Sequence, residues 1–248
     1  MTTAENLLKV SEGLDKVESL NTELAQSLYG GDTGYRGHYD EFWDAYQSYG
    51  KRNNYSAAFA GKYWLEDTFK PKYDINNFNT GQLMFWNSDL AVDLPAYLDK
   101  CGVTLDFSKS INAAQAFAFS KFSRIGILDF SIIQNGDGAF SQATNLVTID
   151  KIIVSPNTYM QSTWFGGCNA LVNVTFEGEL NKSGLNFKDC PKLSKASITS
   201  VINALSATTS GLSVTLSKTA VTSAFGSTTS AEWTNLIGTK SNWTINLV

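Results

Sequence analysis

Leu105-Asp106-Phe107-Ser108 recurs as Leu128-Asp129-Phe130-Ser131, letter for letter and 23 residues later. The same frame continues along the chain with weaker identity. Four apolar anchors, spaced 24, 25 and 22 residues apart, carry it on: Phe122, Leu146, Leu171 and Leu193. A phenylalanine stands six residues before each of the last three anchors: Phe140, Phe165 and Phe187. This regular spacing indicates a copied structural unit.

A short β-rich run follows each anchor, at 125–130, 149–154, 174–177 and 196–198. A period in the low twenties with one short strand per unit is typical of a leucine-rich-repeat solenoid. One unit cannot bury its apolar edge alone, so neighbouring units bury it together. The alternative is an ordinary β-rich domain whose spacing arises by chance. The exact tetrapeptide copy favours the solenoid, with rows of Phe and Leu in its core.

The repeating unit combines Ala-Phe, a polar turn with Cys, then Leu and a strand; two such turns are Cys168-Asn169-Ala170 and Cys190-Pro191-Lys192. This unit resembles the BspA-type leucine-rich repeats, which occur in surface proteins of bacteria and protists and in some bacteriophage proteins. The resemblance covers roughly 100–110 residues. The first unit departs from it with Phe117 and Phe119, and the third with Trp164 beside Phe165. The resemblance implies binding or scaffolding and supplies no catalytic residues.

The composition excludes several classes of protein. The net charge is −4 with both signs scattered, which argues against a nucleic-acid surface, since that needs a clustered basic face. No apolar run approaches 18 residues, so no membrane insertion is expected, and no secretory signal is visible at the N-terminus. Cys168 and Cys190 occupy matching repeat positions and are interpreted as small buried residues; metal binding is the rival, without any Cys-x-x-Cys spacing. No cofactor is expected.

The first 30 residues carry a heptad pattern. Apolar residues step by 3 and 4, with one Asn among them, and predict an oligomerisation seam: Leu7, Val10, Leu14, Val17, Asn21, Leu24 and Leu28. The alternative is a helix packed on its own chain's core, although such helices usually show a wider apolar stripe. Leu at a positions with Val at d positions disfavours a dimer, while the buried Asn favours one. We expect a homotrimer.

An aromatic-rich segment follows a glycine-rich break at 30–34. Five rings share one helical face: Tyr39, Phe42, Trp43, Tyr46 and Tyr49. This face could bind carbohydrate, but a helix that covers the end of the repeats is the more common use of such a face. The combination of this segment with the repeats resembles uncharacterised proteins of gut-bacterial phages. His38, the single histidine, lies in a Gly/Tyr-rich turn and has no nucleophile motif nearby.

The remaining segments alternate between strands and helices. Gln82–Trp86 is predicted as a strand and Leu90–Leu98 as a short helical return. After the repeats, apolar periodicity predicts two strands, 211–217 and 243–248, and three helices, 197–205, 218–225 and 230–237.

Asp106 and Asp129 are the one carboxylate pair at equivalent repeat positions. On adjacent strands they would lie about 5 Å apart. Such a pair could serve as acid and base, or bind calcium. The plainer interpretation is that a copied outward-facing Asp stays solvated.

Together these features predict an α+β chain built on a short leucine-rich-repeat-like β solenoid. Its predicted parts are a coiled-coil helix at 1–30, an aromatic helical cap at 31–80, the solenoid at 81–198 and a C-terminal α/β cap at 199–248. The expected function is that of a non-enzymatic structural or adhesive virion protein of a bacteriophage. Its expected partners are other copies, other virion proteins and a host-surface glycan or protein. The alternative is a secreted or cell-surface adhesin of a gut bacterium; a third hypothesis, a glycan-active enzyme, would use the Asp pair.

Overall fold

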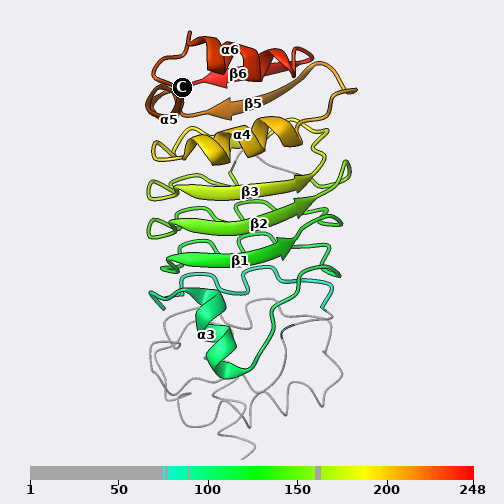
Figure 1. Cartoon of the computed structure of the whole chain (residues 1–248). Helices are drawn as coiled ribbons and strands as arrows, with labels where there is room; N and C mark the ends of the chain where they lie inside the picture. Colours follow the sequence, from blue (N-terminus) through cyan, green and yellow to red (C-terminus); the bar gives the residue numbers. More distant parts are fainter. Residues whose placement is uncertain (1–74, 76–77, 89, 160–162) are drawn as a thin grey trace, which may run out of the picture.

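The computed structural model describes residue 75 and residues 78–88, 90–159 and 163–248 (Figure 1). The elements in this part of the chain are α3 (Leu94–Cys101), β1 (Arg124–Asp129), β2 (Thr148–Val154), β3 (Asn173–Gly178), β4 (Asn186–Phe187), α4 (Lys195–Ala204), β5 (Leu212–Leu216), α5 (Lys218–Phe225), α6 (Ala231–Gly238) and β6 (Trp243–Leu247). None of these described helices has the length and apolar character needed to cross a membrane.

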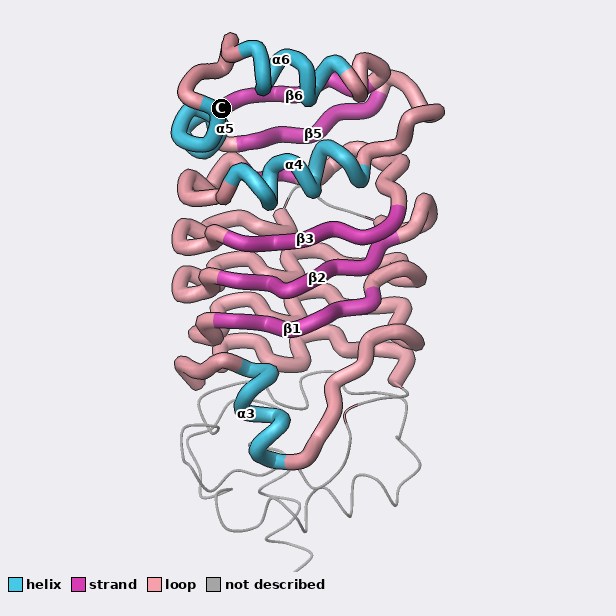
Figure 2. Tube along the Cα trace, viewed as in Figure 1, coloured by secondary structure: helices cyan, strands magenta, loops and turns pink. Residues whose placement is uncertain are grey.

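The first sheet consists of β1, β2 and β3, paired in that order and all parallel. Ile125 aligns with Ile149, which aligns with Val174, and all three side chains are buried. Parallel neighbours require a long connection from the end of one strand to the start of the next. Here that connection is a run of turns that passes behind the strands (Figure 2). The strands predicted to follow the first three anchors are confirmed.

A row of phenylalanine rings fills the core behind this sheet. The turns of successive units contribute Phe85, Phe117, Phe140, Phe165 and Phe187. Neighbouring rings are stacked, with centroids 4.4–5.7 Å apart and interplanar angles of 9–19°. The four predicted anchors are also buried. Because each ring contacts the ring of the next unit, burial in one unit depends on its neighbours.

Helix α4 stands where a fourth strand was predicted. Ser194 caps the helix by accepting a hydrogen bond from the Ser197 amide, and Ile198, Val201 and Ile202 are buried along one face. These apolar positions are spaced 3 and 4 apart, the period of a helix rather than of a strand. The predicted β-rich run at 196–198 is therefore wrong, whereas the helix predicted over 197–205 is confirmed.

Two serine hydroxyls of α4 satisfy the edge of β3. The Ser197 hydroxyl lies 2.9 Å from the Val174 amide, which donates to it, and Ser200 accepts from the Phe176 amide at 2.8 Å. Both hydroxyls also donate back, to the carbonyls of Val172 and Phe176. A buried backbone amide without an acceptor is costly, so these hydroxyls replace the ladder that a fourth strand would have formed.

Replacing Ser200 with alanine is expected to lower the free energy of unfolding by about 1–2 kcal/mol, because the amide of buried Phe176 loses its acceptor. Urea denaturation followed by circular dichroism measures the change. Thr199→Ala on the same helix is the matched control and is expected to shift stability by about 0.5 kcal/mol or less. Equal losses in both variants would contradict this role of Ser200.

The second sheet consists of β4, β5 and β6, which are again parallel. It forms on the side of the molecule where the turns lie, behind β1–β3 (Figure 2). Its first strand contains Phe187, the last ring of the phenylalanine row. The arrows of β5 and β6 therefore point opposite to those of β1–β3 in Figure 1. The two strands and three helices predicted from 197 onward are confirmed as β5, β6, α4, α5 and α6, with shifts of one or two residues at their ends.

The predicted fold class is wrong. The described residues form two separate three-stranded parallel sheets with four helices, a mixed α/β arrangement, rather than an α+β chain built on one continuous leucine-rich-repeat-like solenoid. The physical reason lies at α4, where helical periodicity ends the first sheet and hydroxyls cover its edge. The predicted coiled-coil helix lies outside the described residues, as does the predicted aromatic cap apart from residue 75 and residues 78–80.

The strand predicted at Gln82–Trp86 is also wrong, since this segment is a series of turns. Leu83 and Asn87 adopt the left-handed conformation there, with φ of 56° and 54°, which no β-strand permits. The predicted helical return is confirmed in part, because α3 begins at Leu94 with Pro95 in its first turn.

Candidate functional site

Several sequence-predicted residues lie outside the described residues, and the predictions made for them stay predictions. They are His38, the rings of 39–49, and the seam residues Leu7, Val10, Leu14, Val17, Asn21, Leu24 and Leu28.

The carboxylates of Asp106 and Asp129 each accept a hydrogen bond from a serine two residues further along the chain. The Asp106 carboxylate accepts from the Ser108 amide at 2.8 Å and from its hydroxyl at 2.9 Å. Asp129 accepts from the Ser131 amide at 3.0 Å. Carboxylates used in this way stabilise the tight turn after a strand. Among the described residues, no group of three or more His, Cys, Asp and Glu is placed to hold a metal ion.

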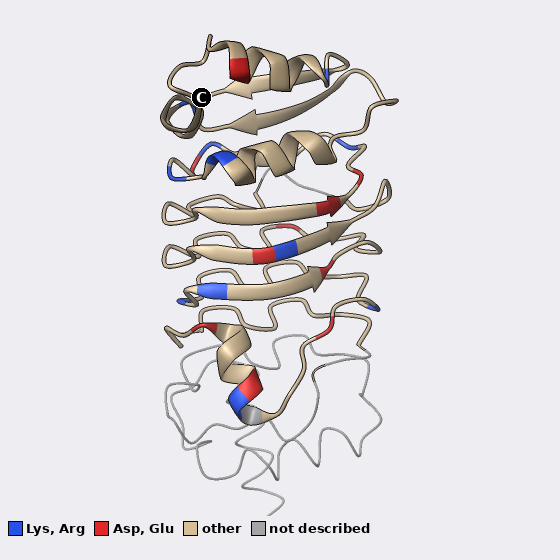
Figure 3. Cartoon of the chain, in the orientation of Figure 1, with Lys and Arg blue, Asp and Glu red and all other residues tan. Residues whose placement is uncertain are grey.

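The outward face of β1–β3 is the most distinctive surface of the described part. Figure 3 shows positions of both charges, coloured blue and red, along its strands. On β1, the first strand of this sheet, Ile127 is 58% exposed, although isoleucine is usually among the most buried residues. Asn173, Thr175 and Glu177 are exposed on the neighbouring β3. We take this face as the candidate site and call it the β1–β3 face.

A bulge in β2 gives this face its charges. Between Ile149 and Ile152 the register with β3 shifts, so two residues of β2 lie where β3 has one. Those two residues are Asp150 and Lys151, and both are partly exposed, whereas the isoleucines on either side are buried. A bulge places an extra residue on one side of a strand. As a result, one strand supplies an anion and a cation side by side.

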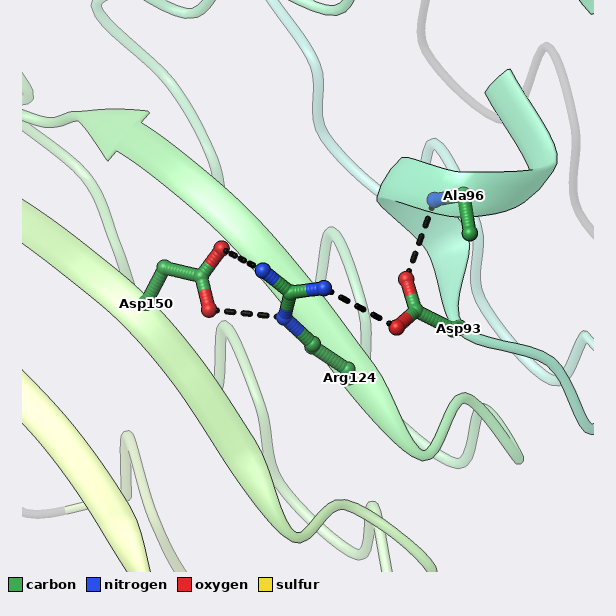
Figure 4. Close-up of polar contacts among 4 residues, drawn as sticks. All are labelled: Asp93, Ala96, Arg124 and Asp150. Carbon is green, nitrogen blue, oxygen red and sulfur yellow. Dashed lines mark hydrogen bonds and ion pairs between the residues drawn. The ribbon is translucent and has the colours of Figure 1, made fainter. Parts of the chain in front are cut away.

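The two charges of the bulge pair in opposite directions. Asp150 forms a bidentate pair with Arg124 on β1, at 2.8 Å to Nε and 2.7 Å to Nη2 (Figure 4). Lys151 pairs with Glu177 on β3 at 2.5 Å. Arg124 also donates at 3.0 Å to Asp93, whose second oxygen accepts from an α3 amide. One group of ion pairs thus links the start of α3 to β1 and β2, and a separate pair links β2 to β3. The planar bidentate contact holds Arg124 and Asp150 in place.

Sequence reasoning missed these ion pairs, although a signal was available. Arg124 and Asp150 stand 26 residues apart, as do Lys151 and Glu177. Arg124 is aligned with Thr148, and Glu177 with Ile153, so each ion pair runs diagonally to a residue two positions along the neighbouring strand. What the spacing alone does not reveal is the bulge, which turns both Asp150 and Lys151 to the same side.

The pKa of Asp93 lies below its usual value of 3.8, mainly because its carboxylate accepts from the Ala96 amide and further because Arg124 is adjacent. The folded state therefore binds this proton less well than the unfolded chain. The resulting stabilisation is present above about pH 3.8 and is lost as the pH falls through the folded-state pKa.

Arg124→Met is expected to raise the pKa of Asp93 part of the way back toward 3.8, because the hydrogen bond from Ala96 remains. Carboxyl carbon shifts followed by NMR across an acid titration report the midpoint. Lys151→Met removes a charge from the same face without touching Asp93 and is expected to leave that midpoint unchanged. An unchanged midpoint in Arg124→Met would show that Arg124 does not act on Asp93.

An open groove borders the β1–β3 face where α4 lies along β3. Its volume is about 790 Å³, and it is lined by Phe176, Gly178, Lys195, Ala196, Thr199, Ser200, Asn203 and Ala204. Lys195 is already paired with Glu232 of α6 and lies 5.4 Å from the ring centre of Phe225. The lining of the groove is therefore mainly apolar, with the Thr199 hydroxyl and the Asn203 amide among its polar groups.

The chain was compared with known proteins at three levels. No family model, no curated protein and no solved structure matches it. The candidate site is therefore argued from its own geometry.

Cys168 and Cys190 are buried free thiols at matching positions, as predicted. The Cys168 thiol lies 3.1 Å from the Phe140 carbonyl, and the Cys190 thiol 3.7 Å from that of Phe165. Burial raises the pKa of Cys168 to about 12 and also raises the pKa of Cys190. Both thiols are therefore neutral at pH 7, and the thiolate is the reactive form.

In a Cys101→Ser background, iodoacetamide is expected to label these two thiols at least 100-fold more slowly in native protein than in urea, since both burial and neutrality protect them. Mass spectrometry of timed samples measures the rates. Rapid native labelling would contradict the buried placement.

Proposed function

We propose that this chain is a non-enzymatic structural and adhesive protein of a bacteriophage virion, as a tail fibre, baseplate or head-decoration subunit. The β1–β3 face is its binding surface. The observation that carries the binding role is the exposure of Ile127, an apolar side chain among fixed ion pairs. The virion assignment rests on the heptad seam and on the resemblance of the copied unit to BspA-type repeats.

The geometry of the face suits protein or glycan recognition. Interfaces commonly combine an apolar centre with a polar rim. Here Ile127 on β1 supplies exposed apolar surface, and the ion pairs Arg124–Asp150 and Lys151–Glu177 lie beside it. The groove along α4 adds a mainly apolar lining. Because these pairs fix their side chains before binding, a partner orders few of them on contact.

Multiple copies would strengthen such a surface. The proposed seam, with Leu14 at its middle, would hold three chains together, so that three faces bind at once. Linking weak sites raises their combined affinity by roughly 10²–10⁴-fold, and the size of the gain depends on the geometry of the linkage.

Light scattering on the purified chain tests the assembly. We expect three times the chain mass of 27.1 kDa, and a single chain mass for Leu14→Glu, which places a charge in the seam. Ser11→Glu, outside the seam, is the matched control and is expected to stay trimeric. A wild-type mass of 27.1 kDa would end the proposal of a coiled-coil trimer.

Adsorption to cells tests the face. Fluorescently labelled protein is expected to bind at least one strain in a panel of gut bacteria, and Ile127→Asp is expected to reduce binding at least tenfold. Thr144→Asp, at an exposed turn away from the face, is the control for added charge. Binding that Ile127→Asp leaves unchanged would remove the β1–β3 face from the proposal.

Neighbouring genes separate the virion from the alternative, an adhesin of the bacterium itself. Portal, tape-measure or lysin genes beside this gene are the expected result. An export signal encoded directly upstream and in frame would favour the adhesin.

A further inference from the structure

A second surface lies on the turns behind the strands, away from the β1–β3 face. There Trp86 and Phe119, from neighbouring units, are 37% and 48% exposed. Their ring centroids lie 6.2 Å apart, and the ring planes meet at 71°. Two large aromatic rings in edge-to-face contact thus present part of their surface to solvent.

The turn at Phe119 requires a left-handed backbone, but it does not require a bulky residue there. Phe119 has φ of 58°, a left-handed conformation that costs a bulky residue roughly 1–2 kcal/mol. Backbone hydrogen bonds between units place Phe119 in one row with Asn87 of one neighbouring unit and Gln142 of the other. Those positions share the conformation with φ of 54° and 60°, and the next one along is Gly167 with φ of 77°. Only at Phe119 does an exposed aromatic ring occupy this row.

Burial does not compensate for this strain, since about half of the Phe119 side chain faces solvent. Strained residues that the packing does not need are typical of functional sites. The contact with Trp86 orients both rings but leaves them exposed. The pair therefore has the character of a prepared binding platform.

The groups along the same row are neutral amides. Asn87 and Gln142 flank Phe119 in the row, and Gln115 lies on the same segment with its side chain exposed. An amide both donates and accepts hydrogen bonds, as a sugar hydroxyl does. The C–H groups of a pyranose carry slight positive charge and suit the negative face of an aromatic ring.

We propose that Trp86 and Phe119 form a stacking platform for a neutral glycan, with the amides of Asn87 and Gln142 as hydrogen-bonding partners. This deepens the proposed function, on which it rests, by giving the adhesive protein a glycan site distinct from the β1–β3 face. The absence of a charged side chain from the aligned row of Asn87, Phe119 and Gln142 favours a neutral sugar over an acidic one.

An array of printed neutral and acidic bacterial and mammalian oligosaccharides, probed with the full-length chain, tests the site. We expect retention by neutral oligosaccharides, and at least a tenfold weaker signal for Phe119→Gly and for Trp86→Ala. Glycine adopts φ of 58° without strain, so Phe119→Gly removes the ring while the backbone keeps its conformation. Tyr159→Ala, which removes a 44% exposed ring that belongs to neither surface, is the matched control and is expected to retain full binding.

A wild-type chain that binds no neutral oligosaccharide on the array overturns the glycan platform. Binding that survives both Phe119→Gly and Trp86→Ala also overturns it. Cell adsorption that protease treatment of the cells abolishes, with no signal on the array, would assign the rings to a protein partner instead. Adsorption lost in Ile127→Asp but kept in Phe119→Gly would reject the platform and leave the proposed function standing, whereas wild-type protein that adsorbs to no strain counts against the proposed function itself.

Discussion

Gly178→Ala is expected to destabilise the protein by about 3 kcal/mol or more, enough to reduce its soluble yield. Gly178 has φ of 103°, and a Cβ placed on it would lie 2.0 Å from the carbonyl oxygen of Val154 on the adjacent strand. Backbone cannot yield as a flexible side chain can, so β3 would have to separate from β2 at this point. Two costs combine here, the disfavoured conformation and the lost strand pairing.

Gly211→Ala is the matched control, because Gly211 also has positive φ, 75°, but open space where a Cβ would lie. It is expected to cost only about 1 kcal/mol, from the conformation alone. Urea unfolding of both variants, followed by circular dichroism, separates the steric cost from the conformational one. Similar losses in the two variants would show that the contact with Val154 is relieved cheaply.

Phe140→Ala is expected to lower the free energy of unfolding by about 3–5 kcal/mol. Phe140 is fully buried at the middle of the phenylalanine row and stacks on Phe117 at 5.7 Å and on Phe165 at 5.2 Å. Its removal opens a cavity between two units and interrupts the row, because neither remaining ring can reach the other.

Phe140→Leu keeps most of the volume and is expected to cost less than half as much, which separates cavity formation from ring stacking. Ile127→Ala, at a site 58% exposed, is expected to change stability by about 0.5 kcal/mol or less. Thermal unfolding by calorimetry measures all three. A Phe140→Ala variant as stable as Ile127→Ala would mean that the row does not hold the units together.

Local elements followed from the sequence wherever one period dominated. The strands after Phe122, Leu146 and Leu171 were predictable because a short run rich in β-branched residues follows each anchor. Helices α5 and α6 were predictable from capping serines, Ser217 and Ser230, whose hydroxyls accept from amides three residues on. The turns at Gln82–Trp86 were not predictable, because consecutive apolar residues there imitate a strand while the backbone visits the left-handed region.

The candidate site was less predictable than the fold elements. The copied tetrapeptide suggested Asp106 and Asp129 as a carboxylate pair, yet each carboxylate accepts a hydrogen bond within its own turn. The ion pairs across β1–β3 depend on a bulge that only strand pairing reveals. The exposure of Phe119 was equally hidden, because its spacing resembles that of the buried Phe117 beside it.

The sequence by itself determined β1, β2, β3, β5, β6 and the helices α4 to α6, and that one phenylalanine of each unit lies in a shared core row. Both depend on periodicity and on the chemistry of caps, which act over a few residues. Only the tertiary structure decided that α4 closes the first sheet, that the second sheet grows from the turn side, and which charges meet. Those outcomes depend on satisfying the buried amides at the β3 edge, and the hydroxyls that do so lie more than 20 residues further along the chain.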